Sequence, residues 1–242
     1  MSKSSLLAAT AAASVFAVFA APAAVPQVPD DGKIVNFAVN SEVLDAWHGG
    51  VQGFHAKRNV ESKRTGALSE FAATRFNAYV GYDVAPWFTV YGLGGVLSAK
   101  NNKARISSDT ETVWGAGAWF SLLDDDQMDF LSTIARYRLT AGAEVSRGDP
   151  NDLAWTQIDA FLTFEILNDM YLPDAMFPTQ VGAFAGPVFS KLDIDGYDQE
   201  GDNDWGFQAG LDFRFADGIY ALGSYTWFGD DSVASFSAGF RF

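Results

Sequence analysis

Cysteine is absent from the 242-residue chain. A small secreted scaffold held together by disulfides is therefore excluded, and an exported form of the protein has to be stable without them. Positive charge is scarce as well, since 16 Lys and Arg stand against 30 Asp and Glu, a formal net charge of −14. Nucleic acid is bound by clustered basic residues, so this balance excludes nucleic acid as a partner.

The motifs of common enzymes are also missing. The chain contains no GxSxG nucleophile motif, no HExxH zinc motif and no glycine-rich phosphate loop. Its two histidines are His48 and His55. His55 lies near the expected end of a strand, where a barrel hydrolase would use a histidine with Asp or Ser at its rim. Because no nucleophile motif accompanies it, the sequence predicts neither an enzyme nor a cofactor, and hydrolysis through His55 is kept as a distant alternative.

Long apolar runs are confined to the N-terminus. Residues 1–23 contain an Ala-rich segment from Leu6 to Ala21, which predicts a secretory signal peptide cleaved after Ala20 or Ala23. The alternative is a retained membrane anchor, because the run approaches the ~20 residues of a spanning helix. No later apolar run is long enough for such a helix, so residence in a membrane would have to rely on β structure.

What the sequence does contain is alternation of apolar and polar residues. A period of two is typical of strands that have one apolar face. Five segments follow it clearly: 73–84, 131–145, 154–166, 204–218 and 231–242. Less regular strands are expected at 87–97, 111–122, 180–192 and 218–228, and a first strand within 46–58. The total of about ten strands, uncertain by two, predicts a single all-β domain over 46–242.

The expected links alternate in length. Links at 83–86, 124–127 and 216–218 are short, and a medium one spans 168–179. Longer polar links, apart from a tight one at 229–232, are expected at 56–70, 98–110, 146–152 and 193–204. This is typical of a closed antiparallel up-and-down transmembrane β-barrel whose ends face different environments. An even strand number places both termini at the short-turn end, and residues 24–45 form a polar lead or the start of the first strand.

The choice between a soluble and a membrane barrel depends on the apolar face. That face is free of charge along 131–145 and 154–166, and it accepts small residues, whereas a soluble core prefers bulky interlocking ones. Lipid outside and charge inside is therefore the favoured arrangement, because an arginine facing lipid would cost roughly 2–4 kcal/mol near the midplane. The charged residues predicted to face the lumen are Arg75, Arg136, Arg138, Arg214 and Arg241, with Glu144, Asp159, Glu165 and Asp212. Aromatic residues near strand ends, where a lipid-interface girdle is expected, are Tyr82, Trp87, Trp119, Trp205 and Trp227.

With these features, the chain from about residue 46 resembles the small outer-membrane β-barrels of Gram-negative bacteria, the OmpA-like and porin-like barrels. The closing segment FSAGFRF carries much of the resemblance, with Phe236, Phe240 and Phe242 on one face. The resemblance implies that these three residues are the signal read by the barrel assembly machinery, and that the short-turn end is periplasmic. Residues 34–47 depart from the pattern and are an extended first strand, a plug or a periplasmic segment.

Two polar segments could bind ligands outside the lumen. An oxygen-rich run contains Asp198, Glu200, Asp202 and Asp204, but the glycine and the last Glu of a calcium-binding EF-hand loop are out of place, so no metal site is predicted. The first two long links are basic and could contact the phosphates of lipopolysaccharide or simply keep the loops soluble. Their basic residues are Lys57, Arg58, Lys63, Arg64, Lys100, Lys103 and Arg105.

Two functions remain open at this point. One is a narrow or largely plugged barrel with a structural or surface-interaction role through its loops, and the other is a small porin. The predicted lumen charges almost balance, and inward Tyr79, Trp155 and Phe161 would narrow a barrel that has far fewer strands than a general porin. The sequence therefore favours the plugged barrel.

Overall fold

The computed structural model describes residues 47–85, 87–101, 106–107, 110–128, 134–148, 154–170, 177–195, 197–199, 204–215 and 218–241. The predicted signal peptide, the polar lead up to residue 46 and the terminal Phe242 lie outside these residues. No helix in the described part of the chain is long and apolar enough to cross a membrane.

Long antiparallel strands form the wall of a barrel, as predicted. In the described residues there are ten of them: β1 (Trp47–Ser62), β2 (Leu68–Ala85), β3 (Phe88–Asn101), β5 (Glu111–Met128), β6 (Ile134–Gly148), β7 (Trp155–Asp169), β8 (Gln180–Ile194), β10 (Trp205–Arg214), β11 (Tyr220–Phe228) and β12 (Asp231–Arg241). Two short strands extend this wall: β4 (Ile106–Ser107) pairs with the end of β3, and β9 (Tyr197–Gln199) pairs with the end of β1. The clear and the less regular strand predictions are all confirmed.

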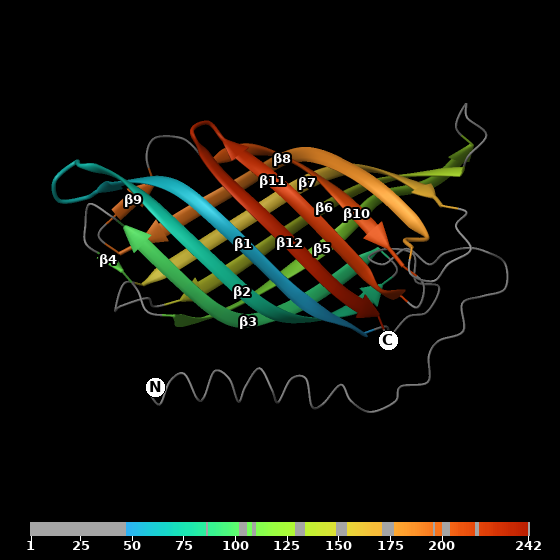
Figure 1. Cartoon of the computed structure of the whole chain (residues 1–242), viewed down its shortest axis with the longest axis horizontal. Coiled ribbons are helices and arrows are strands. Elements are labelled where there is room, and N and C mark those ends of the chain that lie inside the picture. Colours follow the sequence, from blue (N-terminus) through green and yellow to red (C-terminus); the bar gives the residue numbers. More distant parts are fainter. Residues whose placement is uncertain are drawn as a thin grey trace.

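The barrel closes by pairing its first long strand with its last. β12 lies antiparallel to β1, with His48 opposite Arg241 and Lys57 opposite Ser232. Figure 1 shows these two strands side by side, blue against red. Every other long strand pairs with its sequence neighbour among the long strands, including β8 with β10. Trp47 and Arg241 therefore lie at one end of the barrel, called the terminus end below; the opposite end is called the loop end.

In the described residues of the five clear segments, the side chains alternate between the two faces as predicted. On β2, Arg75 and Asn77 are buried in the lumen, while Phe76 between them is 47% exposed on the outer wall. On β7, Glu165 is buried and Phe164 is exposed. The same alternation runs through β6, β10 and β12. In these segments the apolar side chains thus lie on the outside of the barrel, and the charged side chains point into its interior.

The strands extend further than the sequence predicted, so several links are shorter. The short link expected at 124–127 is wrong, because β5 continues to Met128 with Asp124 opposite Arg138. A β-bulge between Ser121 and Leu123 permits this, since one extra residue restores the alternation beyond it. The long link expected at 56–70 is also mostly strand, and it shrinks to 63–67.

Because of these extensions, the links at the two ends of the barrel are more similar in length than predicted. The residues between successive long strands are 86–87, 129–133, 170–179 and 215–219 at the terminus end. At the loop end they are 63–67, 102–110, 149–154, 195–204 and 229–230, and β4 and β9 lie within two of these stretches. The predicted contrast between short turns and long loops is therefore weak. The orientation of the barrel has to be argued from its side chains instead.

Candidate functional site

Apolar side chains fill the loop end of the lumen. They come from β1, β2, β3, β5, β7 and β8 and pack into one buried cluster, called the apolar plug below: Val60, Phe71, Ala73, Leu97, Ala99, Val113, Trp155, Leu192 and Ile194. Leu97 and Trp155 are at most 1% exposed. The sequence identified Trp155 as inward but missed the cluster, because most of its members lie in segments assigned to links or to strands without a clear face.

An ion pair crosses the lumen next to the plug. Arg75 Nη2 of β2 donates to Glu144 Oε1 of β6 at 2.6 Å, and its Nη1 donates to Ser146 Oγ at 2.6 Å. Tyr91 Oη donates to the other oxygen of Glu144 at 2.9 Å, and the Arg75 guanidinium lies 4.3 Å from the centre of the Phe54 ring. Because β3 and β5 lie between the partners in the wall, this contact ties non-adjacent strands together across the interior.

A second group of charged side chains comes from β5, β6, β7 and β10. Arg138 Nη1 donates to Glu165 Oε2 at 2.8 Å, and Arg214 Nη2 donates to Asp212 Oδ2 at 2.8 Å. Arg214 Nη2 also lies 3.9 Å from Glu165 Oε2, which links the two pairs. Arg136 and Arg138 both approach Asp124, the residue placed inside by the β5 bulge.

A third cluster joins the first and last strands at the terminus end. Asp83 of β2 is 2% exposed, and its Oδ1 lies 3.0 Å from His48 Nε2 and accepts from Thr89 Oγ1 at 2.6 Å. Its Oδ2 accepts from Arg241 Nη2 at 3.0 Å. His48 and Arg241 are themselves register partners across the β1–β12 pair. Asp83 therefore binds both strands that close the barrel.

Asp83, Asp124 and His48 were missed by the sequence analysis. Asp83 and Asp124 fell in segments assigned to short links, so their inward direction was not considered. Continuing the alternation of β2 from Arg75 by steps of two reaches Asp83, which is the signal that would have found it. The predicted lumen arginines thus have carboxylate partners, Asp83 and Asp124, that the sequence analysis did not identify.

Arg58 is another departure from prediction. Instead of lying in a basic loop, it points into the lumen from β1 and is 3% exposed. Its Nη2 donates to the carbonyl oxygen of Ser190 at 3.0 Å, and its guanidinium lies 4.0 Å from the centre of the Phe228 ring. Asp159, expected as a partner for arginine, accepts from Gln157 Nε2 at 2.8 Å.

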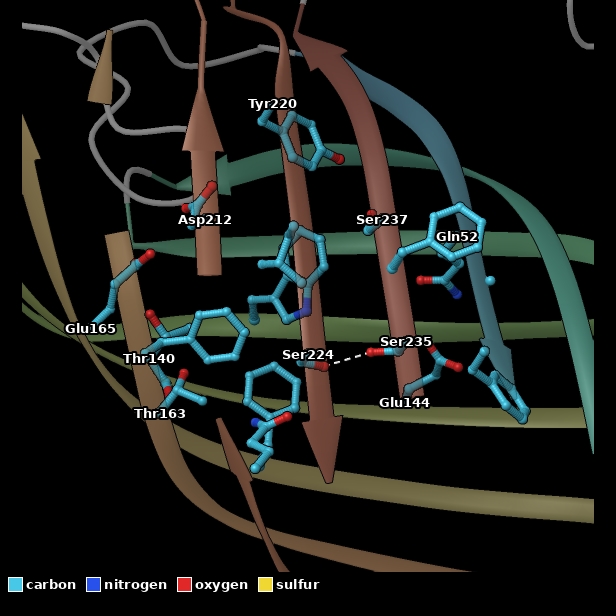
Figure 2. Close-up of a pocket in the computed structure, with 18 of the residues that line it drawn as sticks. Gln52, Thr140, Glu144, Thr163, Glu165, Asp212, Tyr220, Ser224, Ser235 and Ser237 are labelled. Atoms are coloured by element: carbon cyan, nitrogen blue, oxygen red, sulfur yellow. Dashed lines mark hydrogen bonds between the residues drawn. The ribbon is translucent and has the colours of Figure 1, made fainter. Parts of the chain in front are cut away.

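A cavity of about 310 Å³ lies in the middle of the lumen. Its wall combines the Arg75, Arg138 and Arg214 ion pairs with hydroxyl, amide and aromatic side chains. Figure 2 shows Glu165, Asp212, Thr140 and Thr163 on one side of it and Gln52, Ser235 and Ser237 on the other. Trp119 lines this cavity, 4.7 Å from the ring of Tyr91, so its expected place in an outer girdle is wrong.

The remaining candidate residues lie away from the lumen. His55 projects from the outer wall of β1, with its Nδ1 2.9 Å from Thr74 Oγ1. Phe236 and Phe240 are also on the outside, 50% and 40% exposed, whereas Phe242 lies beyond the described residues. Of the acidic run, Glu200, Asp202 and the side chain of Asp198 are likewise undescribed, and Asp204 directly precedes β10. The described residues contain no group of three or more His, Cys, Asp or Glu placed to hold a metal ion.

Comparison with known proteins finds similarity in architecture only. No protein-family model matches the sequence, and no curated protein matches it. An outer membrane channel from Pseudomonas putida F1 is similar at 8% identity with a TM-score of 0.40, over 84% of this chain and 97% of that one. The β domain of the Bordetella autotransporter BrkA has 13% identity and a TM-score of 0.39, over 80% and 98%. The attachment invasion locus protein Ail of Yersinia pestis has 12% identity and a TM-score of 0.24, over 83% and 100%.

Proposed function

We propose that the protein is an outer-membrane β-barrel with a closed lumen, and that it has a structural or surface-interaction role through its loop end. The observation that carries the closed lumen is the apolar plug together with the ion pairs that cross the interior. A diffusion channel needs a continuous water-filled path, and a barrel of about ten strands has little room for one after its side chains are placed. In this barrel the apolar plug and the ion pairs lie across the path that water or solute would have to take.

The outer wall supports a membrane environment. Large apolar side chains project from all around the barrel, among them Trp114, Leu211 and Phe236, while the arginines listed above point inward. A water-soluble protein rarely exposes so extensive an apolar surface. A lipid bilayer accepts such a surface and requires a wall without unpaired backbone edges, which the closed barrel supplies.

Aromatic pairs on the outer wall form a belt near each end. At the terminus end, Trp47 lies 5.0 Å from Tyr82 between ring centres, and Phe88 lies 4.5 Å from Phe120. At the loop end, Phe189 lies 5.3 Å from Trp205, and Tyr225 lies 4.8 Å from Trp227. Two such belts are typical of membrane barrels, whose amphipathic rings lie at the two lipid–water interfaces.

Basic side chains support an orientation with the loop end outside the cell and the termini in the periplasm. Lys57 and Lys100 project outward from β1 and β3, and both are register partners of Ala72 on the strand between them. Arg147 and Lys191 project outward near the same end of β6 and β8. These basic side chains near the loop end are suited to the anionic phosphates of lipopolysaccharide, which we propose as a lipid partner. The assembly machinery would read Phe236, Phe240 and Phe242 of the closing segment.

Conductance across planar lipid bilayers tests the closed lumen. The unchanged protein is expected to insert without producing stable unitary currents. The double variant Trp155→Ala with Phe71→Ala removes the two largest rings of the plug and is expected to increase channel openings. The double variant Phe76→Ala with Phe164→Ala removes two rings from the outer wall and serves as the matched control. A stable unitary current through the unchanged protein would refute the proposal.

A small porin is the second candidate, and the cavity of about 310 Å³ in the lumen is the observation that favours it. The conductance experiment separates the two candidates directly. Residence in the membrane has its own test, since a folded membrane barrel migrates differently from its boiled form on a detergent gel. Extraction of the protein from cells without detergent would contradict that part of the proposal.

A further inference from the structure

Buried side chains border the lumen cavity on more than one side. Phe54 lines the cavity and also packs against the apolar plug, which closes the loop end. Arg214 and Tyr220 line it as well, and they are the last residue of β10 and the first residue of β11. Tyr220 is itself buried in a second apolar cluster with Tyr79, Tyr91 and Leu93. A pocket of this form suits binding rather than passage.

The charges of the cavity wall compensate one another. Arg75 pairs with Glu144, Arg138 with Glu165, and Arg214 with Asp212. A cationic or anionic ligand would add a charge that this wall does not neutralise, in a place where desolvation is costly. The electrostatics of the cavity therefore favour a neutral ligand.

Between the ion pairs, the cavity wall offers neutral hydrogen-bonding groups. Ser224, Ser235 and Ser237 contribute hydroxyls, and Gln52 and Gln208 contribute amides, all of which both donate and accept. Among the described residues, the buried Nε2 of Gln52 has no hydrogen-bond partner, and neither has Nη2 of Arg138. Leaving such a donor unpaired costs about 1–3 kcal/mol, so an oxygen atom placed in the cavity would be stabilised there.

Aromatic rings form the rest of the wall and limit the classes of ligand that fit the cavity. Tyr91, Trp119, Phe161 and Phe184 all line the cavity. A hydrocarbon would cover these rings but leave the polar atoms unpaired, whereas water would pair the polar atoms but leave the rings wetted. A sugar satisfies both, because its C–H face packs on rings while its hydroxyls donate and accept at its edge.

We infer that this cavity is a binding site for a neutral sugar. The volume of about 310 Å³ is comparable to about ten water molecules, enough for a mono- or disaccharide. The polar side chains of Figure 2 surround the space from both sides, as a ligand with hydroxyls around its ring requires. The site holds its ligand within the barrel and requires no conduction through the plug.

Isothermal titration of the full chain in a detergent without a sugar headgroup tests the inference. The probes are glucose and maltose, with gluconate and glucosamine as anionic and cationic analogues. At least one neutral sugar is expected to bind saturably, and about tenfold more tightly than either charged analogue. Absence of saturable binding for both neutral sugars would overturn the inference, and so would equal or tighter binding of a charged analogue.

Variants locate the binding in the cavity. Gln52→Leu removes the amide at similar size and is expected to weaken sugar binding about tenfold. Val51→Leu, one residue away on the outer wall, is the matched control and should bind as the unchanged protein does. If Gln52→Leu does not fold, as judged by gel mobility, Ser235→Ala takes its place. Binding that neither lumen variant weakens would overturn the assignment to this cavity. The bilayer conductance is measured separately, so failure of sugar binding and failure of the closed-barrel proposal are distinguishable.

Discussion

At the scale of single residues, Asp83 contacts both of the strands that close the barrel. Its carboxylate contacts His48 and Arg241, one from each strand of the closing pair, and accepts a hydrogen bond from Thr89 of β3. Removing one partner of a buried ion pair leaves the other charge uncompensated, which is more costly than losing an exposed pair. Asp83 should therefore contribute to the stability of the closed barrel in addition to the backbone pairing of β1 with β12.

Asp83→Asn is expected to lower the free energy of unfolding by about 3 kcal/mol, because Arg241 loses its counter-charge in a buried place. Asp193→Asn is the matched control, since Asp193 is 70% exposed and its oxygen lies 3.6 Å from Lys63 Nζ. That substitution should cost less than about 1 kcal/mol. Urea unfolding in detergent micelles measures both. Equal losses in the two variants would contradict a special role for Asp83.

The same scale shows why the lumen was only partly predictable. The arginines stand out in the sequence because each lies on the polar face of a clear alternating segment, opposite an apolar face. Asp83, Asp124 and Arg58 were assigned to links, because charge near a strand end looks like a turn or a loop in sequence. Whether such a residue ends the strand or continues it into the lumen depends on pairing with a neighbouring strand. Alternation gives the direction in which such a residue would point if the strand continues, but not whether the strand continues.

At the scale of elements, the β5 bulge determines what enters the lumen. Ser121 is opposite Thr140 and Leu123 is opposite Leu139, so one residue between them has no register partner. Leu122 and Leu123 are both exposed on the outer wall, and beyond them Asp124 points inward to Arg138. A one-residue shift in a strand moves every following side chain to the other face. The bulge absorbs one such shift.

Deleting Leu122 is therefore expected to remove the bulge and leave a regular strand that folds, because Ser121 stays inside and Asp124 still faces Arg138. Deleting Ala118, in the regular middle of β5, turns one half of the strand over and should prevent folding. Gel mobility before and after boiling reports the outcome for each. If both deletions fold, or if neither does, the register assigned to β5 is wrong.

At the scale of the whole molecule, strand number and the direction of the faces follow from the sequence, because one wall must face lipid along its whole length. The plug and the cavity do not follow in the same way. Both are formed by residues far apart in sequence, such as Phe71, Trp155 and Leu192, which meet only when the sheet closes on itself. Closure is thus the property on which the site depends.

Because the chain has no cysteine, closure can be tested by introducing a single pair. His55 and Ala234 are register partners on β1 and β12, and both project from the outer wall. The double variant His55→Cys with Ala234→Cys is expected to form a disulfide within one chain under oxidising conditions, since opposed strand residues lie within bridging distance. His55→Cys with Ser235→Cys places the second thiol on the inner face and should not crosslink. Crosslinking between chains only, or to the same extent in both variants, would show that β1 and β12 do not close one barrel in this register.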